Sequence, residues 1–248
     1  MGTIASPSCA REPVTSFDVV ALDGPGGVGK STTARALARR LGYFFLSSGQ
    51  IYRALAWSAL QRGWQPGRPL AEGLLADIRV EIARDGALHV NGEPVGRLLN
   101  TDEISQATSV LSTLPEVREL SNRVQRDTVA ALARDGHFAG VILEGRDIGT
   151  VVFPEARHKF FVTASTAVRA ERRHRELVQT DPSVTLAEVT RALEERDRRD
   201  SQRAIAPLKP APDATVVDTS GLTLEQVVEH LAQAVRGEPE RQRNRKPK

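Results

Sequence analysis

The sequence has a single cysteine, Cys9, among its 248 residues, so no intrachain disulfide can form. It has no apolar run near the roughly 20 residues that a membrane helix needs. The N-terminus also lacks the basic start and apolar core of a secretion signal. Aromatic residues make up only 4% of the chain, which leaves few rings on which nucleic-acid bases could stack. We therefore expect a cytoplasmic protein with no membrane partner.

The charge of the chain is mildly basic, with a formal net charge of +3 and a sequence pI of about 9.3. Basic residues concentrate in the segment from Arg169 to Arg203 and in the last residues, from Arg236 to Lys248. A basic balance fits phosphate-bearing ligands from a nucleotide to DNA, so charge alone does not identify the ligand. The sequence predicts flexible tails at 1–17 and 236–248, the second of them basic.

Short β-rich runs alternate with helical patterns along most of the chain. Alternation of this kind implies crossover connections and a parallel sheet covered on both faces. The predicted fold class is therefore α/β, with a helix-flanked parallel sheet of about five strands. The runs are Asp18–Leu22, Tyr43–Leu46, Val141–Leu143, His158–Val162 and Thr215–Val217.

One segment, 76–98, breaks this alternation. Its apolar runs are separated by Asp85-Gly86 and Asn91-Gly92, which are favoured hairpin turns because these residues tolerate positive φ. We expect a small antiparallel insert there. Further on, Pro115 is placed to open a helix, and capping boxes are expected at Thr185 with Glu188 and at Thr223 with Gln226.

The strongest motif lies between the first strand and the first helix. Residues 24–31, GPGGVGKS, match the G-x-x-x-x-G-K-[ST] pattern of a phosphate-binding P-loop in full. Its backbone N–H groups can surround phosphate oxygens, Lys30 can reach the β- and γ-phosphates, and the Ser31 hydroxyl can ligate Mg²⁺. The sequence thus predicts ATP and Mg²⁺ as cofactors. The cofactor-binding residues are Gly24, Pro25, Gly26, Gly27, Val28, Gly29, Lys30, Ser31 and Thr32.

Two polar segments follow strand ends, where open α/β sheets bind ligands: SSGQIYR at 47–53 and EGRDIGT at 144–150. A later helix carries Arg196, Arg199, Asp200 and Arg203 at spacings of three or four, so they share one face. Arg53, Arg146 and Arg203 can converge on one dianionic phosphate. The alternative for that helix is ordinary surface ion pairing with Glu195 and Asp197.

Taken in order, the P-loop, SSGQIYR, the hairpin insert, EGRDIGTVVFP and ERDRRDSQRAIAPLKPAPDA resemble the bacterial-type cytidylate kinases, P-loop nucleoside monophosphate kinases that phosphorylate CMP or dCMP. The likeness runs from about Val19 to Ala234. It implies one kinase domain at 18–235. Within this domain, 18–47 holds the P-loop and first βαβ unit, 48–115 the NMP-binding region with its insert, 140–165 core strands, 166–184 a short lid and 185–235 the C-terminal core.

The resemblance also implies roles for individual residues. Ser48, Tyr52 and Arg53 hold CMP near its phosphate and ribose; Ser109, Arg118 and Asp147 address the cytosine edge; Arg146 and Arg203 grip the α-phosphate; and Asp200 binds the sugar hydroxyls. The predicted catalytic set combines Arg146 and Arg196, which the resemblance implies, with Lys30 of the P-loop and Arg173 of the predicted lid. Two positions depart from the family pattern, because Ser47 replaces a frequent Asp and Glu144 is one methylene longer than the usual Asp.

The predicted lid carries Arg169, Arg172 and Arg173 at i, i+3 and i+4, on one helical face. We expect this face to close over ATP and to exclude water. The alternative is an ordinary solvated basic face.

Two other functions stay open at this stage. One is a small-molecule P-loop kinase acting on UMP, AMP or shikimate, and the other is a nucleotide-dependent regulatory or nucleic-acid-binding protein. The segment EGRDIGTVVFP and the insert argue against the first, and we do not expect nucleic acid as a partner. A monomer is expected, with CMP or dCMP and ATP as its small-molecule substrates. The preference between CMP and dCMP stays undecided.

Overall fold

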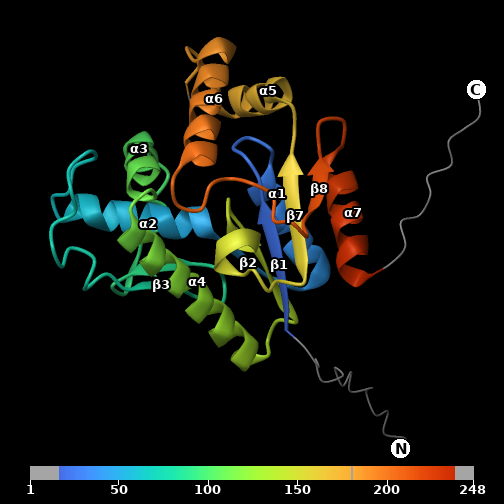
Figure 1. Ribbon diagram of the computed structural model, residues 1–248, viewed down its shortest axis with the longest axis horizontal. Coiled ribbons are helices and arrows are strands. Elements are labelled where there is room, and N and C mark those ends of the chain that lie inside the picture. Colours follow the sequence, from blue (N-terminus) through green and yellow to red (C-terminus); the bar gives the residue numbers. More distant parts are fainter. Residues whose placement is uncertain (1–16, 180, 238–248) are drawn as a thin grey trace, which may run out of the picture.

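The computed structural model describes residues 17–179 and 181–237. At its centre lies a five-stranded parallel sheet in the order β2-β6-β1-β7-β8 (Figure 1). All five predicted strands are present, and their ends lie within one residue of the predicted ones. The strands are β1 (Asp18–Asp23), β2 (Phe44–Ser47), β6 (Gly140–Glu144), β7 (His158–Thr163) and β8 (Thr215–Asp218).

Helices cover both faces of this sheet. α1 (Lys30–Leu41) and α7 (Leu224–Arg236) pack on the face that carries Val20 and Leu22 of β1. α2 (Ser48–Gln61) and α4 (Pro115–Asp135) pack on the opposite face, which carries Ala21. All three β1 residues are fully buried. The continuous apolar run of the central strand therefore follows from burial on both faces.

The predicted insert is a separate three-stranded antiparallel sheet of β3 (Val80–Ile82), β4 (Leu88–Val90) and β5 (Glu93–Pro94). Its turns use positive φ at Gly86, Asn91 and Gly92, as expected for Asp-Gly and Asn-Gly. Apolar residues of β3 and β4, Val80, Leu88 and Val90, are buried in the same core cluster as the α2 side chains. The insert thereby packs against the same core as α2.

Three further helices complete the described chain. α3 (Asp102–Leu111), which the sequence analysis does not predict, is capped by Thr101 and packs on α2. α5 (Thr166–Leu177) and α6 (Leu186–Gln202) pack on each other beyond the carboxyl end of β7 (Figure 1). Both predicted capping boxes are present, at the starts of α6 and α7, and Pro115 is the first residue of α4.

The two predicted tails fall almost wholly outside the described residues. Within them, Phe17 packs against the core, and α7 continues to Arg236 before Gly237 caps it. Across 17–179 and 181–237, no helix has the length and hydropathy of a membrane span.

Candidate active site

A cleft of about 450 Å³ opens at the carboxyl ends of β1, β2 and β6. The segments that follow these strands form its floor: the P-loop after β1, residues 47–53 after β2 and residues 144–147 after β6. One wall carries residues of α2 and α3, and the opposite wall carries residues of α5 and α6. The parallel topology therefore brings the P-loop and both predicted acceptor segments together at one site.

The P-loop turns sharply between β1 and the N-terminus of α1. Gly24 has φ 148°, and a Cβ placed on it would lie 2.0 Å from the backbone oxygen of Val162, so only glycine fits there. Lys30, the first residue of α1, is buried and donates from Nζ to the Pro25 carbonyl at 2.5 Å. Burial, followed by the positive charge of Arg146, lowers the pKa of Lys30 well below its ordinary value. A polyphosphate in the loop would supply the missing negative charge.

A second cavity, of about 430 Å³, adjoins the opposite side of the P-loop. Gly27, Gly29 and Thr32 line both cavities, and Val28 lines only the second. The loop thus separates two spaces, each large enough for part of a nucleotide. The rest of the second cavity is formed by Thr33, Arg172, Arg175, Glu176, Gln179, Thr219, Leu222, Leu224 and Val227.

Oxygen ligands for a cation gather beside Lys30. The Ser31 hydroxyl donates to Glu144 Oε1 at 3.0 Å, and the Ser47 hydroxyl donates to the same oxygen at 2.6 Å. Hydroxyl, carboxylate, phosphate and water oxygens are the ligands that Mg²⁺ prefers. Among residues 17–179 and 181–237, no group of three or more His, Cys, Asp or Glu side chains could hold a metal. Ser31 and Glu144 therefore fit a Mg²⁺ whose remaining ligands come from phosphate and water.

Asp23, the last residue of β1, fixes the segment that carries Arg146 and Asp147. Its two carboxylate oxygens accept the backbone N–H groups of Ile148 at 2.9 Å and Gly149 at 2.8 Å. These residues begin η1 (Ile148–Val152), a π-helical turn. Burial raises the pKa of Asp23 to about 6, although the two amide hydrogen bonds act in the opposite direction.

A buried ion pair lies at the far end of the cleft. Arg118 Nη2 of α4 contacts Asp147 Oδ2, and both side chains are less than a tenth exposed. Arg203 Nη2 lies 3.6 Å from the other oxygen of Asp147. Burial raises the pKa of Asp147, and the positive charges of Arg118 and Arg203 oppose that effect. Thr108, whose hydroxyl is buried and has no hydrogen-bond partner, lines the cleft beside this pair.

Arginines dominate the rest of the cleft. Arg146 donates from Nε to Asp200 Oδ2 at 3.0 Å, and Arg53 donates to the Leu99 carbonyl at 2.8 Å. The nearby charge of Arg146 is the largest cause that lowers the pKa of Arg196 to about 10. Burial, followed by the charge of Arg173, lowers the pKa of Arg53. The guanidinium groups thus repel one another, and an anion between them would relieve that repulsion.

The three arginines of α5 have different environments. Arg169 is buried, donates to the Gly26 and Ala164 carbonyls at 3.1 Å and pairs with Asp197. Arg172 donates to the Thr219 carbonyl at 2.8 Å and lines the second cavity. Of the three, only Arg173 lines the cleft. Arg169 and Arg172 thus tie α5 to its surroundings, which the spacing alone does not reveal, and a closing lid at 166–184 stays a prediction.

Most of the predicted site residues do line the cleft, but four do not. Gly24 and Pro25 lie in the turn below it, Val28 faces the second cavity, and Ser109 bonds to α6 instead. The predicted residues that line the cleft are Gly26, Gly27, Gly29, Lys30, Ser31, Thr32, Ser48, Tyr52, Arg53, Arg118, Arg146, Asp147, Arg173, Arg196, Asp200 and Arg203.

The sequence analysis gave no role to several other lining residues, among them Asn100, Thr108 and Ser112. Thr108 and Ser112 are four residues apart, so they share a face at the end of α3. The signal that could have found them is the start of that helix, where the N-cap Thr101 is followed by two acidic residues.

Comparison with known proteins agrees with this geometry. The family model for cytidylate kinase matches residues 20–237. The chain belongs to the cytidylate kinase family. The resemblance inferred from the sequence motifs is thereby confirmed.

Relatives in this family align with nearly the whole described chain. The chain is 42% identical over 222 residues to the cytidylate kinase of Geobacter sulfurreducens, covering 88% of this chain and 92% of that protein. It is 39% identical over 221 residues to the cytidylate kinase of Nocardia farcinica, covering 88% and 93%. A bifunctional pantoate ligase/cytidylate kinase from Synechococcus is 39% identical over 244 residues, covering 93% of this chain and 42% of that longer protein.

Proposed function

We propose that this protein transfers the γ-phosphoryl group of ATP to CMP or dCMP and produces ADP with CDP or dCDP. The observation that carries the proposal is that the P-loop and the buried Arg118–Asp147 pair lie in one cleft, with the arginines between them. One cleft thus holds residues suited to recognising a base, to binding the phosphate of the acceptor nucleotide and to binding the phosphates of ATP. Family membership supports the same reaction.

ATP binds with its phosphates in the P-loop. The loop N–H groups and Lys30 hold the β- and γ-phosphates, and the second cavity takes the nucleoside. Ser31 and Glu144 would hold Mg²⁺ together with the phosphates. Such an ion would supply positive charge that neutralises the phosphate oxygens.

CMP binds in the other half of the cleft. Its dianionic phosphate takes the place between Arg53, Arg146 and Arg203, whose planar donor groups match phosphate oxygens. Ser48 and Tyr52 lie near the phosphate and ribose, and Asp200 takes the sugar hydroxyls. These side chains all line the cleft, which supports this part of the proposal.

Cytosine is recognised by its hydrogen-bonding edge. Asp147 accepts from the N4 amino group, while Arg118 and Ser109 donate to N3 and O2. Uracil presents a carbonyl oxygen where cytosine has N4, so it would face the Asp147 carboxylate with no proton to share. Because that carboxylate is buried, the repulsion between the two acceptor oxygens is poorly screened, and this cost discriminates between the bases.

The transfer needs alignment more than proton removal. An ionised oxygen of the CMP phosphate attacks the γ-phosphorus, a new P–O bond forms, and the bond to the β–γ bridging oxygen breaks in line. No strong base is required, because the attacking oxygen is already negative. Lys30, Arg146, Arg173 and Arg196 surround the transferring group and stabilise its charge. Closure of residues 166–184 excludes water, which would otherwise hydrolyse ATP.

The protein is proposed to act as a cytoplasmic monomer whose partners are its two nucleotides. The deciding experiment measures ADP formation from Mg·ATP with CMP, dCMP, UMP and AMP offered separately. High turnover with CMP and dCMP and little with AMP would support both the reaction and the base assignment. Preference for another nucleotide would overturn the assignment of Ser109, Arg118 and Asp147. Absence of transfer to any of them would overturn the proposed function.

A further inference from the structure

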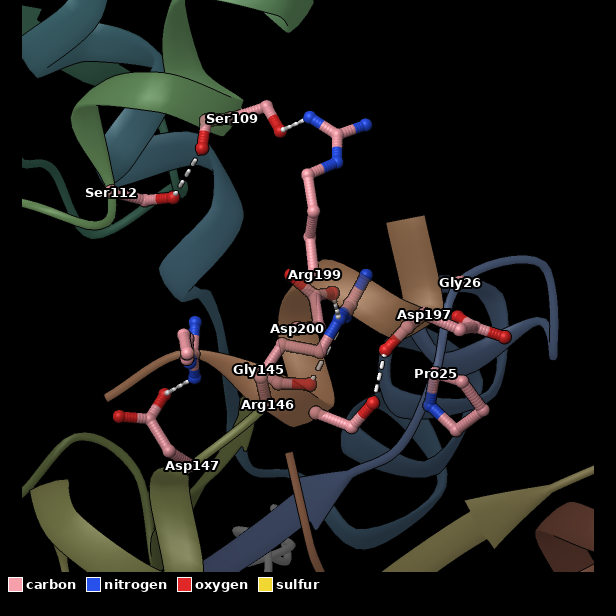
Figure 2. Close-up of polar contacts among 12 residues, drawn as sticks. Pro25, Gly26, Ser109, Ser112, Gly145, Arg146, Asp147, Asp197, Arg199 and Asp200 are labelled. Carbon is pink, nitrogen blue, oxygen red and sulfur yellow. Dashed lines mark hydrogen bonds and ion pairs between the residues drawn. The ribbon is translucent and has the colours of Figure 1, made fainter. Parts of the chain in front are cut away.

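Arg199 is the member of the α6 face that the proposed reaction leaves without a role. Arg196, Asp200 and Arg203 from that face all line the cleft, but Arg199 does not. Its exposed side chain extends toward the opposite wall, where Nη1 donates to the Ser109 hydroxyl of α3 at 2.8 Å (Figure 2). The two residues are 90 positions apart in the chain, so the contact is a tertiary one between the two walls of the cleft.

This contact joins the two walls of the cleft. Among the hydrogen bonds and ion pairs within residues 17–179 and 181–237, it is the only one between the region 48–114, with α2, the insert and α3, and the region 166–214, with α5 and α6. Both regions also contribute residues to the cleft, whose floor is formed by the P-loop, residues 47–53 and residues 144–147. The Arg199–Ser109 bond therefore spans the mouth of the cleft.

The charges on the walls oppose closure when the cleft is empty. Arg53 lies on the α2 wall, whereas Arg173 and Arg196 lie on the other, and their positive charges act on one another. A hydrogen bond from a charged donor to a neutral hydroxyl adds attraction between the two walls. A dianionic phosphate between the walls would turn the repulsion into attraction. The Arg199 bond and the phosphate thus favour the same closed arrangement.

The bond also orients the Ser109 hydroxyl. A serine hydroxyl has one proton to donate and two lone pairs that accept. Because Arg199 occupies a lone pair, the Ser109 hydroxyl keeps its proton free to be donated elsewhere. Ser112, which lines the cleft on the same helix, donates to the Ser109 carbonyl at 3.5 Å, so the end of α3 is linked to this contact as well (Figure 2).

We propose that Arg199 and Ser109 form a latch across the mouth of the cleft, and that Arg199 is thereby a positioning residue for the acceptor nucleotide. The latch holds the end of α3, whose neighbouring Thr108 and Ser112 line the cleft, in place beside the acceptor nucleotide. The inference rests on the proposed function, since it concerns the acceptor half of the same cleft.

The kinetic test compares Arg199→Met with Arg198→Met. Arg198 is also exposed on α6 and is the matched control. We expect Arg199→Met to raise the KM for CMP about 5- to 10-fold, in line with the loss of one charge-assisted hydrogen bond, while the KM for ATP changes less than twofold. Arg199→Lys should recover part of the loss because it keeps one donor. Equal KM values for wild type and Arg199→Met would overturn the latch.

A double-mutant cycle separates the latch from an independent role of Arg199. If Arg199 acts through Ser109, Arg199→Met should have no further effect on the KM for CMP in a Ser109→Ala background. If both substitutions multiply their effects there, Arg199 does not act through Ser109 and the proposal is wrong.

A distance measurement keeps the test independent of the reaction. With Cys9 replaced by serine, cysteines introduced at the exposed positions Gln106 of α3 and Glu194 of α6 can carry a pair of spin labels. In the unliganded protein, Arg199→Met should broaden and lengthen the distance distribution, and Arg198→Met should not. Identical distributions would overturn the latch. A protein that fails to phosphorylate CMP but passes this test would overturn the proposed function alone.

Discussion

At the residue scale, Asp23 shows how one buried carboxylate organises the segment of the cleft that carries Arg146 and Asp147. It ends the central strand and accepts the first two N–H groups of η1, which directly follow Arg146 and Asp147. Its position therefore controls the direction in which those two side chains leave the backbone. Because burial raises the pKa of Asp23 to about 6, this control is linked to pH.

The sign of that linkage gives a prediction. Since the folded-state pKa of Asp23, about 6, exceeds its ordinary value of 3.8, the folded protein binds this proton more tightly than the unfolded chain. The stabilisation is fully present below about pH 4 and is lost as pH rises through 6. Asp23→Asn removes it, so the variant should lose about 1–1.5 kcal/mol more stability, relative to wild type, at pH 5 than at pH 8. Urea unfolding at the two pH values measures this, and an equal deficit at both would contradict the raised pKa.

The places of several residues in the cleft were predictable because each has a sequence signature. Lys30 and Ser31 occur in a motif whose spacing determines their positions, and Asp147 follows the end of a strand. The role of Asp23 was not predictable, since its partners Ile148 and Gly149 are more than a hundred residues away in the chain. The burial of Arg169 was missed for the same reason: its spacing matches that of an exposed basic face, and only the tertiary contact with Gly26 shows otherwise.

At the scale of elements, the P-loop depends on the closeness of β1 and β7. The two strands pair in parallel, and the chain leaves β1 beneath the Val162 carbonyl. Glycine is therefore required at position 24 for two reasons: its positive φ and the lack of room for a Cβ. Gly86 in the β3–β4 turn also has positive φ, but it has open space around it.

This difference predicts unequal costs for the same substitution. Gly86→Ala should cost about 1 kcal/mol, the penalty for positive φ alone. Gly24→Ala adds an overlap with a backbone oxygen that cannot move without shifting β7, so we expect a loss above about 3 kcal/mol and no ADP formation. Chemical denaturation of both variants measures the difference, and similar losses in stability would show that the strands tolerate a shift at this position.

The elements that the sequence predicted well are those with local signals. The five strands, the insert with its Asp-Gly and Asn-Gly turns, and the capped starts of α6 and α7 all have such signals. η1 has none, because a π-helical turn depends on the carboxylate that holds it. α3 was missed although Ile104, Ala107 and Leu111 form an apolar stripe, since the stripe is short and contains serine and threonine.

At the scale of the whole molecule, the cleft concentrates positive charge on a chain with a net charge of only +3. Burial lowers the pKa of Arg53, and the nearby charge of Arg146 lowers the pKa of Arg196. Removing one of these positive charges should therefore relieve repulsion in the unliganded protein but impair its activity.

The Arg196→Gln variant tests whether this charge lowers stability while it supports activity. We expect the unliganded variant to be as stable as wild type or more stable by up to about 1 kcal/mol, a gain limited by solvent screening of this exposed side chain. Turnover should fall about 100-fold or more, because the proposed reaction places this charge next to the transferring group. Thermal unfolding and ADP formation measure the two effects, with Arg198→Gln as control. A large loss of stability would show that Arg196 supports the fold instead.

The strand order has a consequence for how the chain is made. β1 and β2 come first in the sequence, yet neither pairs with the other; both pair with β6, which begins at Gly140. During synthesis from the N-terminus, these two apolar strands thus have no partner in the parallel sheet until more than half of the chain has left the ribosome. Pairings this distant in sequence also slow folding. Until then β1 and β2 are exposed to aggregation. We therefore expect a chaperone to bind this early segment during translation.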